Sequence, residues 1–139
     1  MAGLAHAADQ LLLIGRRNLR GNNSWMHNSA RLVKGPEACT LLMHPRDAAA
    51  RGVETGAVVK LRSRVGEVRA PVHVSDEVAP GVVSLPHGWG HGRDGVELRV
   101  ARERPGASIN DVTDDERVDV LSGNAAFSGT PVWVERVGA

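Results

Sequence analysis

Glycine and proline divide this chain into apolar segments that are short for helices and have the length of β-strands. The 139 residues include 16 glycines and 7 prolines, and both residue types interrupt regular structure and favour turns. Six apolar segments lie between these interruptions, at residues 11–14, 40–43, 58–61, 68–74, 81–85 and 131–137. The pattern predicts about six strands and one or two short helices, arranged as a single small mixed or closed β barrel.

Two local patterns refine this prediction. The run HPRDAAARG at residues 44–52 places Pro45 at a helix start and Gly52 at a helix end, which predicts one short helix. Residues 68–74 alternate apolar and polar side chains, as a strand with one buried face does. Because Pro71 lacks the N–H that a ladder hydrogen bond needs, we expect this strand to lie at an edge or to contain a bulge.

Charge and cysteine content argue against several classes of function. Lys plus Arg number 17 and Asp plus Glu number 16, so the chain lacks the basic excess of a nucleic-acid-binding protein. Cys39 is alone, which leaves neither an intrachain disulfide nor a thiolate cluster for zinc or iron–sulfur. No apolar run is long enough to cross a bilayer, and residues 1–10 lack a signal-peptide pattern. We therefore expect a cytoplasmic protein without membrane insertion, with a disordered lead-in at residues 1–10.

Three polar segments interrupt the strand pattern. They are GRRNLRGNNSWMHN (residues 15–28), LPHGWGHGRDG (residues 85–95) and SINDVTDDERVDVLSGNAAFSG (residues 108–129). In the first segment, the planar forks of Arg16, Arg17 and Arg20 suit phosphate groups. Trp25 adds a ring that can stack on a flat ligand. A phosphorylated, heteroaromatic ligand needs these groups, and a solvated loop rich in asparagine turns explains the same residues equally well.

None of the three segments carries a complete catalytic constellation. The alternating glycines of residues 88–92 disfavour the helix that a metal clamp by His87 and His91 would need, so we predict no metal site. The chain has no GxxxxGK[ST] phosphate loop, no GxGxxG between a strand and a helix, and no GxSxG nucleophile elbow. The residues therefore predict a binding domain with no catalytic residues of its own.

Taken in order, the polar segments resemble one family. The motifs that carry the resemblance are NSWMHN, HPRDAAARG, PGVVSLPHGWGH, NDVTDD and SGNAAF. Over residues 11–135 the chain resembles the C-terminal molybdopterin-dinucleotide-binding domain of the dimethyl-sulfoxide-reductase family of molybdenum and tungsten oxidoreductases. The resemblance implies a six-stranded double-psi β barrel and a binding domain at residues 11–139. It also implies a molybdopterin guanine dinucleotide cofactor in its bis form, whose molybdenum or tungsten another domain holds.

The resemblance also assigns cofactor-binding residues by their positions in the motifs. They are Arg16, Arg17, Asn23, Ser24, Trp25, His27, Asn28, His87, Trp89, Asn110 and Thr113. It implies that the remaining catalytic domains or subunits of an oxidoreductase are the partners of this chain, which is not catalytic in isolation. Two positions depart from the family: Val112 stands where leucine is usual, and Ser128 stands where many members have lysine.

A second function stays open at this point. Double-psi barrels host unrelated functions, so the alternative is a protein-interaction or assembly module with no bound cofactor. A self-processing aspartate decarboxylase on this fold would need a Gly-Ser cleavage pair, which the sequence lacks. Molybdenum and tungsten, and an excised domain and a separate small subunit, are all compatible with the sequence.

Overall fold

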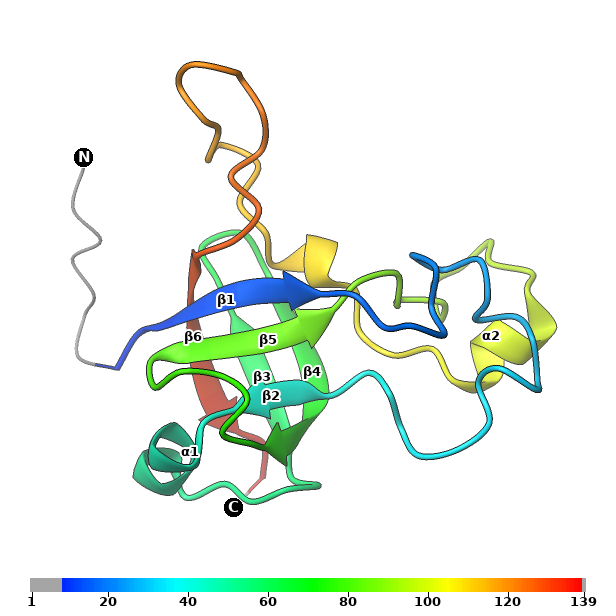
Figure 1. Ribbon diagram of the computed structural model, residues 1–139, viewed down its shortest axis with the longest axis horizontal. Helices are drawn as coiled ribbons and strands as arrows, with labels where there is room; N and C mark the ends of the chain where they lie inside the picture. The colour runs from blue at the N-terminus through cyan, green and yellow to red at the C-terminus, as the bar shows by residue number, and fades with distance from the viewer. Residues whose placement is uncertain (1–8, 139) are drawn as a thin grey trace.

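The structure is a computed structural model that describes residues 9–138 (Figure 1). The expected lead-in at residues 1–10 falls mainly on residues 1–8, which lie outside the described residues. In chain order the elements are β1 (Leu11–Arg16), β2 (Leu41–Met43), α1 (Pro45–Arg51), β3 (Val58–Arg62), β4 (Glu67–Val74), β5 (Val82–Pro86), α2 (Arg99–Glu103), the 3-10 turn η1 (Ile109–Asp111) and β6 (Thr130–Arg136). Each predicted strand segment therefore overlaps an observed strand, with ends that differ by at most two residues.

The strands close into a barrel in the order β1-β5-β2-β4-β3-β6. Two neighbouring pairs are parallel, β1 with β5 and β2 with β4, and the other pairs are antiparallel. Such a mixed barrel leaves no open sheet edge, which removes the site where another strand could add. The prediction of a six-stranded double-psi β barrel is confirmed.

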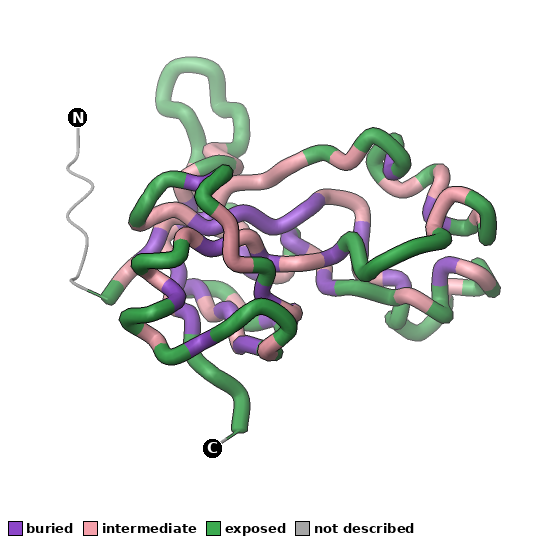
Figure 2. The backbone as a smooth tube through the Cα atoms, turned by 60° about the horizontal axis from the view of Figure 1, so that its bottom comes forward, coloured by how far each residue is buried: buried purple, intermediate pink, exposed green. Residues whose placement is uncertain are grey.

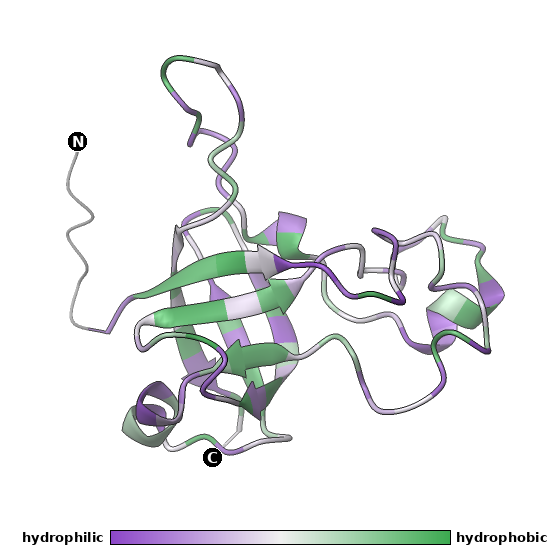
Figure 3. Cartoon of the chain, in the orientation of Figure 1, coloured by the Kyte–Doolittle hydropathy of each residue, from purple (hydrophilic) through white to green (hydrophobic). Residues whose placement is uncertain are grey.

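The barrel core follows from the alternation of apolar residues along the strands. Figure 3 shows hydrophobic residues along the barrel strands, and Figure 2 shows stretches of buried residues along the backbone of the barrel. The largest fully buried side chains include Leu13, Leu41, Met43, Leu61, Leu85, Val59, Val72, Val83 and Val132. The apolar residues of the predicted strand segments thus supply most of the largest buried side chains of the core.

The expectation for Pro71 is wrong in one respect, because β4 is paired on both sides and is not an edge strand. Pro71 lies opposite Val58 of β3, and pairing with β2 begins one residue later, where Leu41 lies opposite Val72. The missing N–H therefore stands where the β2 ladder has not yet begun, and the closed barrel accommodates the proline.

Helix α1 forms where the sequence predicts it. The helix begins with Pro45, and His44 Nδ1 accepts a 3.1 Å hydrogen bond from the backbone N–H of Arg46. It ends at Gly52, whose φ of 62° lies in the left-handed region that glycine enters at little cost. The N-terminal proline and C-terminal glycine thus set both ends of the helix.

Two further regions project from the barrel. The loops that follow β1 and β5 form the loop lobe, residues 17–38 and 87–107, which includes α2 and lies beside one end of the barrel (Figure 1). Residues 114–128 form a second projection, the finger, which is exposed over most of its length (Figure 2). Within residues 9–138 there is no helix that is both long and apolar enough to cross a membrane.

Candidate functional site

The parallel pairing of β1 and β5 places the starts of two predicted polar segments side by side. Arg16 lies opposite Pro86 at the ends of these strands. The backbone N–H of His87 then donates a 3.0 Å hydrogen bond to the carbonyl of Arg16. Because parallel strands end on the same side of a sheet, both segments continue into the same lobe.

Three buried rings join the two segments inside the lobe. The His27 ring stacks on Trp89, with centroids 3.9 Å apart and planes inclined by 22°. His27 Nδ1 also lies 2.8 Å from His91 Nε2, so one imidazole donates a hydrogen bond to the other. Burial lowers the pKa of both histidines, and proximity to His91 lowers that of His27 further. The pair is therefore held in its neutral form near neutral pH.

A close backbone contact at Gly88 reinforces this junction. Gly88 has a φ of 86°, and a Cβ atom built on it would overlap the carbonyl oxygen of Asn23. Asn22 and Asn23 themselves have φ angles of 42° and 65°, a region that asparagine tolerates better than most residues. Only glycine at position 88 lets the second loop pass this close to the first.

Asn28 connects the first loop to helix α2. Its side-chain Oδ1 accepts hydrogen bonds from the backbone N–H groups of Val100, at 3.0 Å, and Ala101, at 3.1 Å. The residue at the N-cap of α2, Leu98, has no side-chain oxygen to offer. Asn28 thus satisfies two N–H groups in the first turn of the helix from 72 residues away along the chain.

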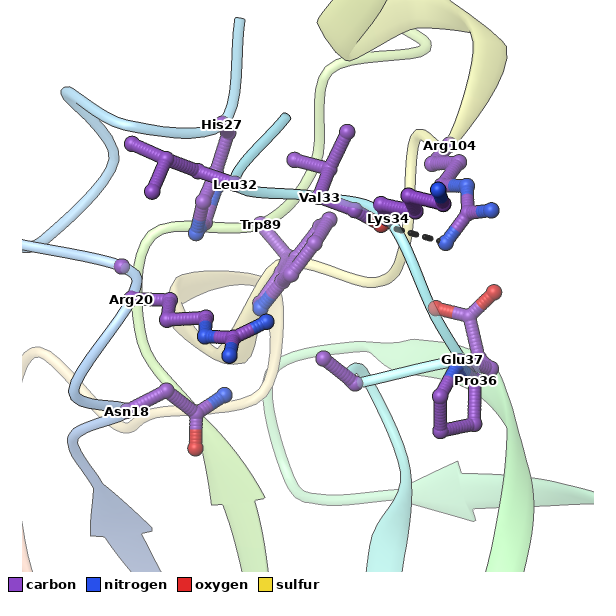
Figure 4. Close-up of a pocket in the computed structure, with 12 residues that line it drawn as sticks. Asn18, Arg20, His27, Leu32, Val33, Lys34, Pro36, Glu37, Trp89 and Arg104 are labelled. Carbon is purple, nitrogen blue, oxygen red and sulfur yellow. Dashed lines mark hydrogen bonds between the residues drawn. The ribbon is translucent and has the colours of Figure 1, made fainter. Parts of the chain in front are cut away.

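A cavity of about 180 Å³ opens beside these rings (Figure 4). Its lining is mixed and comes from both loops: Asn18, Arg20, Gly21, His27, Leu32, Val33, Lys34, Pro36, Glu37, Ala38, Trp89 and Arg104. Trp89 is 8% exposed, and its Nε1 has no hydrogen-bond partner among the described residues. A buried indole N–H ordinarily has an acceptor, so this group is available for an acceptor on a ligand.

The cations around the cavity differ in what they can do. The Arg104 guanidinium already donates to the carbonyls of Val33, at 2.6 Å, and Gly35, at 2.8 Å, so it closes the loop that bears these residues. Within residues 9–138, Arg20 makes no side-chain hydrogen bond, and Figure 4 shows it beside Trp89 and Asn18. A free guanidinium fork next to an unpaired N–H suits a phosphate or a carbonyl-rich ring.

The two arginines that end β1 point to different surroundings. The Arg16 guanidinium donates to the carbonyl of Ser84 on β5, at 2.5 Å, and to that of Thr40, just before β2, at 2.6 Å. Burial lowers the pKa of Arg16 from its ordinary value. Arg17 is exposed and donates to Asn23 Oδ1 at 2.9 Å. Arg16 therefore joins three parts of the barrel end, and Arg17 faces solvent on the lobe.

The remaining predicted residues are distributed around the lobe. Ser24 lies next to Asn23 in the Gly88 contact, and Trp25 is 85% exposed. The His87 ring stacks on Phe127 with centroids 4.5 Å apart, and burial, followed by the charge of Arg17, lowers its pKa. None of these side chains lines the cavity that Trp89 faces.

Asn110 and Thr113 lie at η1, away from this cavity. Thr113 Oγ1 donates a 3.3 Å hydrogen bond to the carbonyl of Asn110, whose side chain is exposed. Asp111, between them, pairs with Arg93 of the second loop. Apart from Arg16 at the barrel end, the predicted residues therefore form two groups, one on the loop lobe and one at η1, rather than a single cluster.

Sequence reasoning missed several residues of the cavity, including Asn18, Lys34, Glu37 and Arg104. No motif marks them, because they meet only through the paths of two loops. It considered His91 only as a metal ligand, whereas the structure pairs this residue with His27. In residues 9–138 no three His, Cys, Asp or Glu side chains are arranged to hold a metal ion.

The fold and the site together define a double-psi β-barrel domain with a cavity of mixed lining between two loops at one end of the barrel. The molydopterin dinucleotide binding domain family matches residues 11–131, which is most of the chain. The chain belongs to this family. The family covers both loops of the lobe as well as the barrel, so the cavity and the η1 group both fall inside the matched region.

Two curated relatives illustrate the relationship. The dimethyl sulfoxide/trimethylamine N-oxide reductase of Rhodobacter capsulatus is 45% identical over 56 residues, which cover 40% of this chain and 7% of that protein. A tetrathionate reductase subunit from Salmonella typhimurium is 30% identical over 112 residues, which cover 68% of this chain and 11% of that relative. The chain thus spans a small part of the length of the curated relatives it matches.

A solved structure with the same fold is the acetylene hydratase from Pelobacter acetylenicus. The TM-score is 0.77 at 18% sequence identity, and the match covers 91% of this chain and 18% of that one. At this identity the similarity shows the fold. It also places a barrel of this kind within a much longer chain in that protein.

Proposed function

We propose that this chain binds the dinucleotide part of a molybdopterin guanine dinucleotide as one domain or small subunit of a molybdenum or tungsten oxidoreductase. Membership of the molydopterin dinucleotide binding domain family supports a cofactor of this type. The matched relatives include a dimethyl sulfoxide/trimethylamine N-oxide reductase and a tetrathionate reductase subunit, which supports an oxidoreductase as the parent protein. The alternative of an assembly module without cofactor has no comparable support.

The observation that carries the proposal is the unpaired, buried N–H of Trp89 at a cavity with a mixed polar and apolar lining. Leaving such a group without an acceptor costs ~1–3 kcal/mol, and a bound ligand removes this cost. A nucleotide-linked pterin offers phosphate oxygens and ring carbonyl and nitrogen acceptors. The guanidinium of Arg20 beside the indole adds a positive charge that phosphate would neutralise. The residues present therefore fit this class of ligand.

Within this proposal the residues of the chain bind and orient, and the cofactor supplies the redox chemistry. Arg17 and Arg20 hold anionic groups on the lobe, and Trp25 offers an exposed ring on which a flat ligand can stack. The neutral His27–His91 pair keeps Trp89 in place by stacking and hydrogen bonding. Asn110 and Thr113 supply polar contacts at η1, and the metal ligand belongs to another part of the parent protein.

The test is the variant Trp89→Phe in the complete oxidoreductase, because phenylalanine keeps an aromatic ring against His27 and removes the N–H donor together with part of the indole's volume. Without the Trp89 N–H, an acceptor on the cofactor would have no donor in a closed site, which should weaken cofactor retention by about tenfold. Metal and nucleotide content per mole of purified protein measure retention. Trp133→Phe is the matched control, since Trp133 lies on β6 against Arg62 and outside the lobe. Equal cofactor content in the two variants would contradict the proposal.

A further inference from the structure

The finger, residues 114–128, ends in a tip that is apolar and almost fully exposed. Val120 is 94% exposed and Leu121 96%, and Val118 on the stem is 49% exposed. Figure 3 shows hydrophobic colour at the far end of this projection, well away from the barrel and from the loop lobe. Two adjacent aliphatic side chains in water are unfavourable and mark a surface that another molecule covers.

The tip is held in one conformation by its own hydrogen bonds. Asp119 Oδ2 accepts from both the backbone N–H and the hydroxyl of Ser122, at 2.8 and 2.7 Å. The carbonyl of Asp119 accepts from Gly123 N–H at 2.7 Å, and its own N–H donates to the carbonyl of Asn124 at 2.7 Å. The turn therefore orients Val120 and Leu121 outward instead of letting them fold back onto the stem.

The stem joins this turn firmly to the barrel. Val118 and Ala125 form a β-bridge, and the Arg117 guanidinium donates to the carbonyl of Gly129, next to β6, at 2.7 Å. At the base, Arg64 makes a bidentate pair with Asp114, at 2.7 and 2.6 Å. Ordering a polar stem in order to present two apolar side chains is a costly arrangement unless the tip makes contacts of its own.

The kind of partner that covers the tip follows from the size of the chain and the charge of the finger. The chain covers 7% and 11% of two matched reductases, so most of such a protein lies outside it. A tip of two side chains is too small for the ~1,200–2,000 Å² of a stable free-standing interface, so it fits one anchor within a larger contact. Glu116 pairs with Arg64 at 3.3 Å, whereas the flanking carboxylates Asp115 and Asp119 make no ion pair within residues 9–138 and favour a basic rim on the other side.

We propose that the finger docks its apolar tip into an apolar cleft, rimmed by lysine or arginine, on the remaining catalytic domains of the parent oxidoreductase. The inference depends on family membership and on the geometry of the finger, and not on any contact between this chain and the cofactor. It assigns Val120 and Leu121 as anchors of the domain interface. The acidic flank steers and orients the contact.

Cysteine labelling of the chain and of the complete oxidoreductase tests this assignment. The native Cys39 is 1% exposed, and burial raises its pKa to about 11, so it should not react with a maleimide at neutral pH. Leu121→Cys should label rapidly in the isolated chain and at least tenfold more slowly in the complete protein. Val58→Cys, on the exposed side of β3, is the matched control for reagent access. An equal labelling rate of Leu121→Cys in both forms would overturn the proposal.

A double variant tests the energetic role of the tip. Because both side chains are exposed in this chain, Val120→Ser with Leu121→Ser should leave its unfolding midpoint unchanged. The change should weaken association with the rest of the oxidoreductase by about tenfold or more, measured by dissociation of a separate subunit or by protease cleavage at the domain boundary. Unchanged association of the double variant would overturn the role of the tip as an anchor. The proposal would also fail if labelling of Leu121→Cys in the isolated chain slowed as the protein concentration rose, because the tip would then contact a second copy of the chain. Cofactor content in Trp89→Phe reports on the proposed function separately, so either proposal can fail alone.

Discussion

His27 Nδ1 lies 2.8 Å from His91 Nε2, and this contact joins two loops whose residues are 64 positions apart in the chain. The stacking of His27 on Trp89 and the helix cap from Asn28 lie on the same junction. The two polar segments are thus one folded unit rather than two independent loops. The stability of the candidate site should depend on each of these contacts.

The first prediction concerns pH. Burial lowers the pKa of His27 and His91 below the ordinary 6.5, so below about pH 6.5 the unfolded chain binds more protons than the folded one. The stabilisation from the neutral pair is complete above that pH and is lost as the pH falls through the lowered folded pKa values. Hydrogen exchange of the lobe amides should therefore accelerate between pH 7.5 and 5.5, after correction for the intrinsic exchange rate.

A matched pair of variants isolates this effect. His27→Gln removes the titrating ring and should flatten the pH dependence of lobe exchange, at some cost in stability at every pH. His73→Gln replaces an exposed histidine on β4 and should retain the full dependence. Identical pH profiles for the two variants would mean that the buried pair does not control opening of the lobe.

The second prediction concerns Asn28 and helix α2. Asn28→Ala leaves the N–H groups of Val100 and Ala101 without their acceptor, which should lower the free energy of unfolding by ~0.5–2 kcal/mol. Asn28→Asp keeps an acceptor oxygen and places a negative charge at the helix start, so it should restore most of the loss. Denaturant unfolding of the two variants measures the difference. Equal destabilisation by alanine and aspartate would contradict the capping role.

The fold could be predicted because its determinants are local. Glycine and proline limit the segments, alternation sets their buried faces, and Pro45 and Gly52 set both ends of α1. The mispredicted feature, an edge position for Pro71, depended on which strand lies beside β4 and where that pairing begins. Such neighbours are decided by barrel closure and not by the residues of the strand itself.

The site could be predicted only as a set of polar loops. The resemblance predicts that Asn28 and Arg16 contact the cofactor. In the structure Asn28 Oδ1 caps α2, and the Arg16 guanidinium donates to the carbonyls of Ser84 and Thr40. The hydrogen-bond partner of a side chain is often a backbone group. Because backbone groups are the same at nearly every position, the sequence does not indicate which of them will be the partner. Arg20 was noted as an anion fork from its type alone, and its place beside Trp89 follows from the loop path.

The third prediction compares two glycines with the same φ angle. Gly88 and Gly95 both have a φ of 86°, but a Cβ at Gly88 overlaps the carbonyl of Asn23 and a Cβ at Gly95 meets nothing within 4 Å. Gly95→Ala should therefore cost only the ~1–2 kcal/mol of the left-handed conformation. Gly88→Ala should cost ~1–3 kcal/mol more, because the two loops must separate. Thermal unfolding of both variants measures the gap, and equal losses would show that the close approach at Gly88 is not needed.

The fourth prediction separates the two arginines that end β1. Arg16→Met keeps the aliphatic stem but leaves the carbonyls of Ser84 and Thr40 without their donor, which should lower the free energy of unfolding by ~1–3 kcal/mol. Arg17→Ala removes an exposed side chain whose one hydrogen bond within residues 9–138 goes to Asn23, and it should change stability by less than ~0.5 kcal/mol. Urea unfolding of the isolated chain gives both values.

For cofactor retention in the complete oxidoreductase, the order of the two variants should reverse, with Arg17→Ala having the larger effect. Arg17 has a guanidinium that can leave Asn23 for a phosphate, and a charge-assisted bond of ~1.5–3 kcal/mol corresponds to about a tenfold or greater loss of retention in Arg17→Ala. Arg16 cannot turn to a ligand without giving up both barrel carbonyls, so any cofactor loss in Arg16→Met should follow its loss of folded protein. Normalising metal and nucleotide content to the folded fraction distinguishes these causes. Full retention in Arg17→Ala would remove this residue from the site, whereas loss in Arg16→Met beyond its unfolded fraction would show that Arg16 contacts the cofactor directly.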